Sequence, residues 1–282
     1  MLNSCSIDKI CDDKNICKNN RDMLTNGRIL ELINNFPKIM GQTIEGSPYE
    51  VQLIDDTLYI FGSNTISGWL TNLDIRTVSY EGSIYHNQYL QVALNIIKWI
   101  ENKNVKNIIG HSAGSAIAMI MVSLRPYQFC CMVTLCPIRP MDKITCKKII
   151  NLVQWISITG CDDPIRMFGS DFTFGIDGDH IDIDMRDIQK KNDKVKYYLF
   201  TNIAAPFLGY NIFDIATLHC LNSYCQMANM IENFKNVSID DSPLHINMVK
   251  SDHKTFIYTV KTMSYIVRFI NIMYNILTFR WS

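Results

Sequence analysis

The segment around residue 110 places the strongest constraint on how this chain can fold. Residues 105–109 are predicted to form a short buried strand, and Gly110-His111-Ser112-Ala113-Gly114 follows it. The apolar run SAIAMIMVSL at 115–124 then predicts a buried helix. Glycine permits backbone conformations and close approaches that other residues resist. A buried strand that turns at glycines straight into a buried helix indicates a sheet covered by helices.

The neighbouring segments continue this alternation of strand and helix. Residues 132–135 and 155–159 predict two more short strands, and a helical segment at about 142–152 separates them. Upstream, residues 49–54 and 57–61 predict a hairpin, and 88–101 predict an amphipathic helix. Such an order is typical of parallel strands with crossovers. We therefore expect an α/β fold, with a polar arm at 1–26 and one domain at 27–282.

The glycine-bounded turn has the Gly-x-Ser-x-Gly pattern, in the strand-to-helix context that gives this pattern chemical meaning. In this context the serine sits on a strained turn with its hydroxyl projecting from the sheet, so Ser112 is the candidate nucleophile. The helix that follows directs its positive N-terminus and the amide of Ala113 toward a developing oxyanion.

A serine nucleophile needs a histidine base and a carboxylate, and in this fold type the carboxylate and then the histidine follow the serine, on later loops. Asp162 and Asp163 come directly after the predicted strand 155–159, at the sheet edge where an acid is needed. We favour Asp163, which precedes Pro164-Ile165. Asp162 can instead cap the turn.

Four histidines follow the acid: His180, His219, His245 and His253. His253 is the predicted base because it lies on a late polar loop, just before an apolar segment. His245 is the alternative. A lone histidine such as His219 is more often an ordinary core or surface residue.

Several ordered motifs resemble the class 3 (fungal-type) lipase family of the α/β-hydrolase superfamily. The matching segments are YIFGSNTISGWLTNLD at 59–74, GSIYH at 82–86, GHSAG at 110–114, TLCPIRP at 134–140, TGCDDPI at 159–165 and HKTF at 253–256. The resemblance implies an α/β-hydrolase fold with a mostly parallel central sheet and helices on both faces. It also implies a triad of Ser112, Asp163 and His253, and an oxyanion hole formed by Ser63 and Ala113.

The segment 64–74 resembles the lid of these lipases. Its apolar residues Ile66, Trp69, Leu70 and Leu73 lie at helical spacing, although ordinary core packing produces the same spacing. Together with His111 they are the predicted lid and substrate-binding residues.

The chain departs from the family pattern at two places. It has Ile60-Phe61-Gly62 where the family has Phe-Arg-Gly, so the arginine that supports the oxyanion loop is absent. Ser115 replaces a glycine that follows the turn.

Charge and composition exclude several classes of function. The chain has 27 basic and 27 acidic residues, a net charge of zero, which gives no electrostatic reason to bind nucleic acid. The ten cysteines lack zinc-site spacing, and the aspartates between 171 and 187 do not match a calcium loop. No secretory signal or apolar run of membrane-spanning length is recognised. We therefore expect an intracellular protein with no metal and no cofactor.

The leading hypothesis is a serine esterase or lipase that hydrolyses a carboxylic ester of a lipid, an acylglycerol or a phospholipid. Its expected partners are the lipid substrate and, transiently, a membrane or lipid-droplet surface. Contact with that surface is expected to be hydrophobic, since the net charge is zero. The alternative hypothesis is an inactive lipase-like scaffold that binds lipid or protein partners.

Overall fold

The central feature of the fold is a seven-stranded sheet. The structure is a computed structural model that describes residues 23–64, 76–138, 140–149, 152–160, 195–200 and 219–233. The sheet order is β1-β2-β3-β6-β7-β8-β9. Its strands are β1 (Gln42–Thr43), β2 (Glu50–Ile54), β3 (Thr57–Ile60), β6 (Asn107–His111), β7 (Cys131–Leu135), β8 (Gln154–Gly160) and β9 (Val195–Phe200).

The five strands from β3 to β9 are parallel, while β1 and β2 form an antiparallel edge. A separate hairpin consists of β4 (Thr77–Tyr80) and β5 (Ser83–His86). The predicted strands 105–109, 132–135 and 155–159 correspond to β6, β7 and β8, and the predicted hairpin to β2 and β3. The expected fold class, an α/β-hydrolase fold with a mostly parallel sheet, is confirmed.

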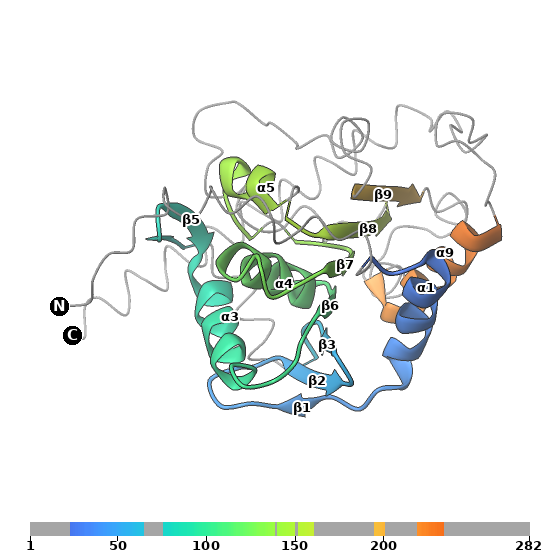
Figure 1. Ribbon diagram of the computed structural model, residues 1–282, viewed down its shortest axis with the longest axis horizontal. Coiled ribbons are helices and arrows are strands. Elements are labelled where there is room, and N and C mark those ends of the chain that lie inside the picture. The colour runs from blue at the N-terminus through green and yellow to red at the C-terminus, as the bar shows by residue number, and fades with distance from the viewer. Residues whose placement is uncertain are drawn as a thin grey trace, which may run out of the picture.

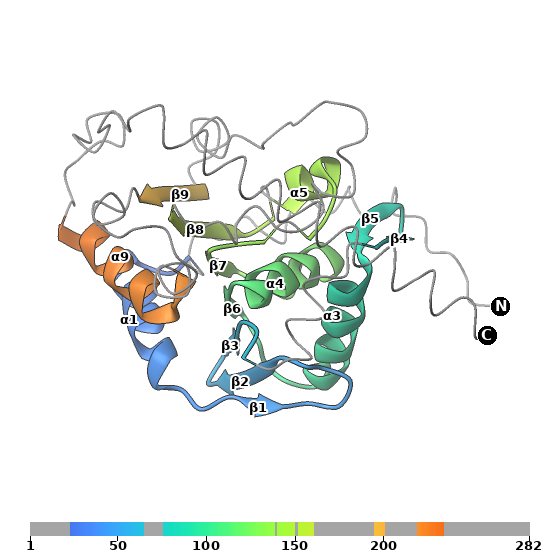
Figure 2. The same cartoon turned by 180° about the vertical axis from the view of Figure 1, so that it is seen from behind.

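Helices cover both faces of the sheet (Figures 1 and 2). One face carries α3 (Asn87–Trp99), α4 (Ala113–Leu124) and α5 (Lys143–Ile149). The other carries α1 (Asn26–Asn35), which leads into a 3-10 turn at Phe36–Lys38, and α9 (Leu221–Asn233). A parallel sheet needs this double cover because its strands are apolar on both sides. β3, β6 and β7 are accordingly buried along their whole length.

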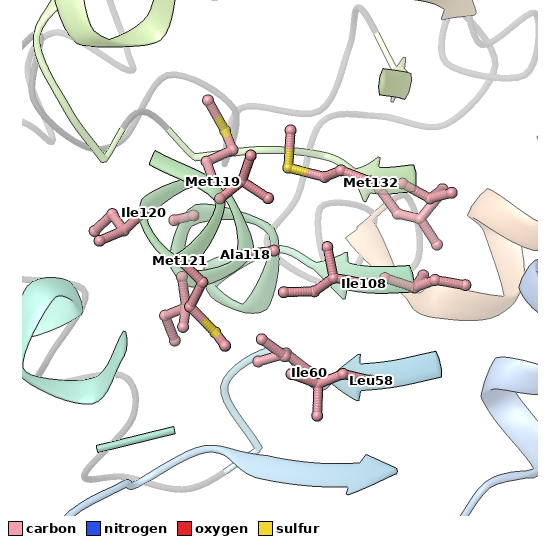
Figure 3. Close-up of a cluster of buried hydrophobic side chains, with 14 of the residues drawn as sticks. Leu58, Ile60, Ile108, Ala118, Met119, Ile120, Met121 and Met132 are labelled. Carbon is pink, nitrogen blue, oxygen red and sulfur yellow. The ribbon is translucent and has the colours of Figure 1, made fainter. Parts of the chain in front are cut away.

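An apolar layer lies between α4 and the middle of the sheet (Figure 3). Leu58 and Ile60 of β3, Ile108 of β6 and Met132 of β7 contribute to it, and each is fully buried. All but one of the α4 residues are buried. This packing fixes the helix that begins immediately after Ser112, so the start of α4 is held rigidly over the sheet edge.

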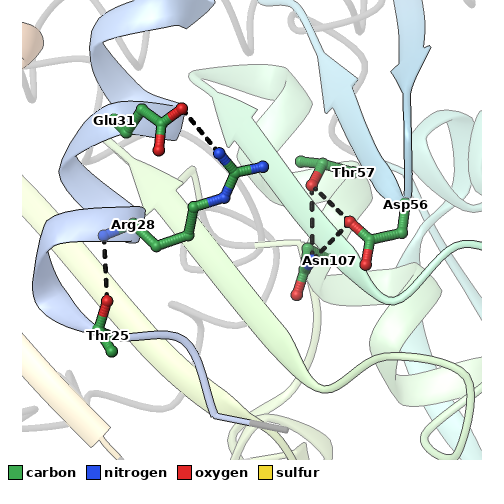
Figure 4. A network of polar contacts seen from close by, with 6 residues as sticks. All are labelled: Thr25, Arg28, Glu31, Asp56, Thr57 and Asn107. Carbon is green, nitrogen blue, oxygen red and sulfur yellow. Dashed lines mark hydrogen bonds and ion pairs between the residues drawn. The ribbon is translucent and has the colours of Figure 1, made fainter.

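A polar network fixes the register between the β2–β3 turn and β6 (Figure 4). The side chain of Asn107 donates to Asp56 Oδ1 at 3.1 Å, and Thr57 Oγ1 donates to the same oxygen at 3.2 Å. The amides of Lys106 and Asn107 donate to the Asp56 carbonyl. Satisfying these groups locally holds β3 and β6 in parallel register. The ends of both strands, where the candidate site begins, are therefore aligned.

The first and last described helices pack on each other although they are far apart in sequence (Figure 2). Asn34 and Asn229 exchange two side-chain hydrogen bonds of 2.7 and 3.1 Å. The Cys225 thiol donates to the Ile33 carbonyl at 3.3 Å. These contacts attach α9 to α1 and so define where the residues just before α9 lie.

The segment GSIYH at 82–86 has a structural role. The side chain of His86 caps α3 by accepting the amide of Tyr89 at 3.3 Å, and its ring stacks on the Tyr89 ring. Both side chains are buried. The motif therefore connects the β4–β5 hairpin to α3.

Some sequence predictions fall on residues that the structure does not describe. They concern most of the N-terminal arm and the aspartate-rich stretch at 171–187. Among the helices of the described residues, none has the length and apolar character required to cross a membrane.

Candidate active site

The turn between β6 and α4 holds Ser112 in a strained conformation. Its backbone angles are φ 57° and ψ −125°, a region that non-glycine residues rarely occupy. Ser112 is 4% exposed and directly precedes Ala113, the first residue of α4. This is the nucleophile-elbow geometry that the Gly-x-Ser-x-Gly pattern predicts.

Both glycines of the motif are required by close backbone approaches. A Cβ atom at Gly110 would collide with the carbonyl oxygen of Gly114, and one at Gly114 would collide with the carbonyl of Ile60. Helix α4 therefore lies directly against the ends of β3 and β6. The absence of side chains at these positions allows the sharp turn to form.

Ser115 stabilises the turn through a buried set of hydrogen bonds. Its hydroxyl donates to the Gly110 carbonyl at 2.6 Å and accepts from the Leu135 amide at 3.0 Å. The Leu135 carbonyl in turn accepts the amide of Ser112 at 2.9 Å. Ser115 is completely buried. Ser115 thus joins the turn to β7, the next strand of the sheet.

The side chain of His219 contacts Ser112, the predicted nucleophile. Its Nε2 lies 2.7 Å from Ser112 Oγ. A serine hydroxyl is activated when an imidazole nitrogen accepts its proton at this kind of distance. The arrangement can therefore transfer a proton from Ser112 to His219.

The predicted base lies outside the described residues, whereas Ser112, the predicted nucleophile, lies within them. His180, His245 and His253 lie outside the described residues, so the assignment of His253 stays a prediction. His219 is the residue that sequence reasoning treated as ordinary. The chain order contains a signal for it, because His219 follows β9, the last strand of the sheet, and lies just before α9.

Two aromatic side chains surround His219. The His111 ring lies 5.0 Å from the His219 ring, and the Tyr224 ring lies 6.5 Å away in an edge-on arrangement. His111 Nε2 is 2.8 Å from the His219 carbonyl oxygen. Tyr224, on the first turn of α9, is completely buried. Packing of α9 therefore places the histidine at the nucleophile.

The loop after β3 passes close to Ser112. A Cβ atom on Gly62 would lie 3.0 Å from Ser112 Cβ and 3.1 Å from His111 Nδ1. Ser63 follows and is half-buried. Ala113 is the first residue of α4, and amides in the first turn of a helix have no partner within the helix. Ser63 and Ala113, the two predicted oxyanion-hole residues, are thus adjacent in sequence to Gly62 and Ser112. The first turn of α4 contains no acidic residue.

The acid and the lid lie outside the described residues. β8 ends at Gly160, so Asp162 and Asp163 come just after the last described residue of that strand. Residues 65–75, which include Ile66, Trp69, Leu70 and Leu73, are also not described. Their assignments stay predictions.

Other polar chemistry is limited in the part of the chain that the structure describes. In these residues, no three His, Cys, Asp or Glu side chains form a group that can hold a metal ion. Burial raises the pKa of the Cys131 thiol to about 12 and that of the Cys225 thiol to about 11. Since the thiolate is the reactive form, these two cysteines are inert at neutral pH.

Comparisons with known proteins give limited information. No protein-family model and no curated protein matches the chain. Among solved structures, it resembles a mutant form of MDLA from Penicillium cyclopium, at 14% identity over 44% of this chain and 54% of the other, with a TM-score of 0.32. A dienelactone hydrolase-like promiscuous phosphotriesterase from metagenomic libraries aligns at 14% identity over 52% and 62%, with a TM-score of 0.26.

The peroxisomal alpha-beta-hydrolase of Saccharomyces cerevisiae aligns at 8% identity over 62% of this chain and 69% of the other, with a TM-score of 0.26. The chain spans less than two thirds of the length of the MDLA mutant and of the phosphotriesterase. Likenesses at these TM-scores carry no functional argument. The fold assignment rests on the sheet order and on the turn at Ser112.

Proposed function

We propose that this chain is a serine hydrolase that cleaves carboxylic esters through an acyl-enzyme on Ser112, with His219 as the base. The observation that carries the proposal is the 2.7 Å contact between His219 Nε2 and Ser112 Oγ at a strained strand-to-helix turn. Strain at a buried polar residue is typical of functional sites. The buried hydrogen bonds of Ser115 provide the support that such strain requires.

In the proposed reaction, His219 Nε2 accepts the Ser112 proton while Oγ attacks the ester carbonyl carbon. The resulting oxyanion accepts hydrogen bonds from the Ala113 amide and from Ser63. Collapse of this intermediate breaks the bond to the alcohol, which takes the proton from His219. A water molecule then attacks the acyl-enzyme with His219 again as base, releasing the acid and restoring Ser112.

We assign the orienting carboxylate to Asp163, which follows β8 along the chain. The order Ser112, Asp163, His219 is the order found in α/β-hydrolases. His219 takes the role first given to His253, because a base must lie within hydrogen-bond reach of its proton. In the sheet order β8 is two strands from β6, which ends just before Ser112, and it is next to β9.

The substrate class that we propose is a lipid ester. The support is the resemblance of residues 59–74 to a lipase oxyanion loop and lid, and a net charge of zero that gives no electrostatic attraction to an anionic surface. Contact with a lipid surface would then be hydrophobic and only weakly dependent on salt.

The test is covalent labelling together with a chain-length profile. Wild-type protein should react with a fluorophosphonate at Ser112, located by peptide mass spectrometry, and should hydrolyse p-nitrophenyl esters, with long acyl chains preferred over acetate. The Ser112→Ala variant is the control and should do neither. Equal slow hydrolysis by the two proteins, with no label at Ser112, would refute the proposal and favour the binding-scaffold hypothesis.

A further inference from the structure

We propose that His111 is a positioning residue for the reaction, and that it holds His219 at Ser112 through the His219 backbone. This inference rests on the proposed function. It concerns how the base is placed, whereas the sequence resemblance predicts that His111 is a substrate-binding residue.

The hydrogen bond between His111 and His219 fixes the proton on one ring nitrogen. His111 Nε2 lies 2.8 Å from the His219 carbonyl oxygen. A carbonyl oxygen only accepts hydrogen bonds, so Nε2 of His111 must carry the proton. The bond crosses 108 residues of sequence, and it joins the last residue of β6 to the residue that contacts the nucleophile.

Two adjacent residues, His111 at the end of β6 and Ser112 directly after it, therefore contact His219 at two points. Ser112 Oγ hydrogen-bonds the imidazole of His219, and His111 Nε2 donates to the backbone carbonyl of His219. His111 is 9% exposed, and β6 is paired to a neighbouring strand on each side. With both backbone and ring attached to this strand end, the distance between base and nucleophile is set by the central sheet.

The surroundings of His111 keep its ring in this orientation. The ring lies 5.0 Å from the His219 ring and 5.7 Å from the Tyr224 ring. Its Nδ1 edge faces Gly62, where an added Cβ would approach to 3.1 Å. The ring is thus enclosed by the oxyanion loop, the base and helix α9. A change at His111 should alter alignment of the catalytic groups more than it alters substrate binding.

The length of the side chain provides a sharp test. In glutamine the amide nitrogen is separated from Cβ by the same number of bonds as histidine Nε2, whereas in asparagine it is one bond closer. His111→Gln can keep the bond to the carbonyl, and His111→Asn cannot reach it. Displacing a catalytic group by about 1 Å costs about a hundredfold in rate.

We expect His111→Asn to lower kcat about a hundredfold with KM changed less than about twofold, and His111→Gln to recover kcat to within about fivefold of wild type. The assay is p-nitrophenyl ester hydrolysis, with thermal midpoints measured for both variants. An increase in KM at constant kcat would mean substrate contact and would overturn the proposal. Equal losses of kcat in the two variants would also overturn it.

A second measurement uses the wild-type protein and requires no activity. Long-range ¹H–¹⁵N spectra of histidine-labelled protein should show His111 protonated at Nε2, with the signal assigned by its loss in His111→Gln. A His111 unprotonated at Nε2 would overturn the inference. If wild-type protein neither hydrolyses esters nor reacts with the fluorophosphonate, the proposed function fails. If it is active and His111→Asn keeps wild-type kcat, only this inference fails.

Discussion

Replacing Ser115 by alanine removes a single oxygen atom from a completely buried position beneath the nucleophile. That oxygen accepts the Leu135 amide at 3.0 Å and donates to the Gly110 carbonyl at 2.6 Å. Alanine favours helices more than serine does, so helix propensity opposes the loss. A net loss of stability must therefore come from the buried hydrogen bonds.

Ser115→Ala removes two buried hydrogen bonds, each of which contributes about 0.5–1.5 kcal/mol. The free energy of unfolding should fall by about 1–3 kcal/mol. For a domain of this size that corresponds to a melting temperature about 3–8 °C lower. Because the Leu135 carbonyl also accepts the Ser112 amide, kcat should fall as well.

The assay is urea denaturation and thermal melting of wild type and Ser115→Ala, with Ser123→Ala as the matched control. Ser123 lies on the same helix, donates to the Ile120 carbonyl at 2.7 Å and hydrogen-bonds the Tyr85 hydroxyl at 3.1 Å, but it is only partly buried. Its loss should cost about 1 kcal/mol or less. Equal destabilisation of the two variants would refute the account in which Ser115 joins the turn to β7.

Three further predictions follow from the described contacts. Gly114→Ala should abolish the native fold or lower its stability by more than about 3 kcal/mol, measured by urea denaturation, because the added Cβ meets the Ile60 carbonyl. Burial raises the Cys131 pKa from 9.0 to about 12, so the folded state retains a proton that the unfolded state loses. The free energy of unfolding should therefore fall as pH rises above about 9, which urea titrations at about pH 8 and about pH 10 will measure. Asn34→Ala should quicken hydrogen exchange in α9, because it removes both bonds to Asn229.

These three predictions have distinct contradicting results. A Gly114→Ala protein with wild-type stability would disprove the close helix–sheet approach. Stability that does not change between the two pH values would contradict a buried, protonated Cys131. Unchanged exchange in α9 would show that its position does not depend on α1.

The sequence was informative about the fold because the relevant signals are local. The hairpin at Asp55–Asp56, the amphipathic helix after His86 and the strands β6, β7 and β8 each arise from patterns within about a dozen residues. Asp55 adopts a positive φ of 53°, which aspartate tolerates in such turns. Parallel pairing then follows from the order of strands and helices.

The strained turn at Ser112 was predictable for the same reason, since its glycines and its helix are contiguous in sequence. The contact of His219 with Ser112 was not predictable in this way. It depends on the packing of α9 against α1 and β8, through contacts such as Asn34–Asn229 that span about two hundred residues. A polar loop at His253 was a stronger local signal, but local polarity carries no information about which loop returns to the sheet edge.

Ser115 shows another limit of the sequence pattern. It was recognised as a departure from a family glycine, yet its role depends on the neighbouring strand, which the motif does not include. Only the arrangement of β7 beside β6 reveals that its hydroxyl bridges Gly110 and Leu135.

The central claim is that His219 is the base for Ser112, and kcat/KM of His219→Ala and His253→Ala tests it most directly. On a p-nitrophenyl ester, with wild type and Ser112→Ala measured in parallel, His219→Ala should lose about a thousandfold or more in kcat/KM. His253→Ala should stay within about threefold of wild type, since in this account His219 supplies the base. Loss of activity in His253→Ala with activity retained in His219→Ala would contradict the account.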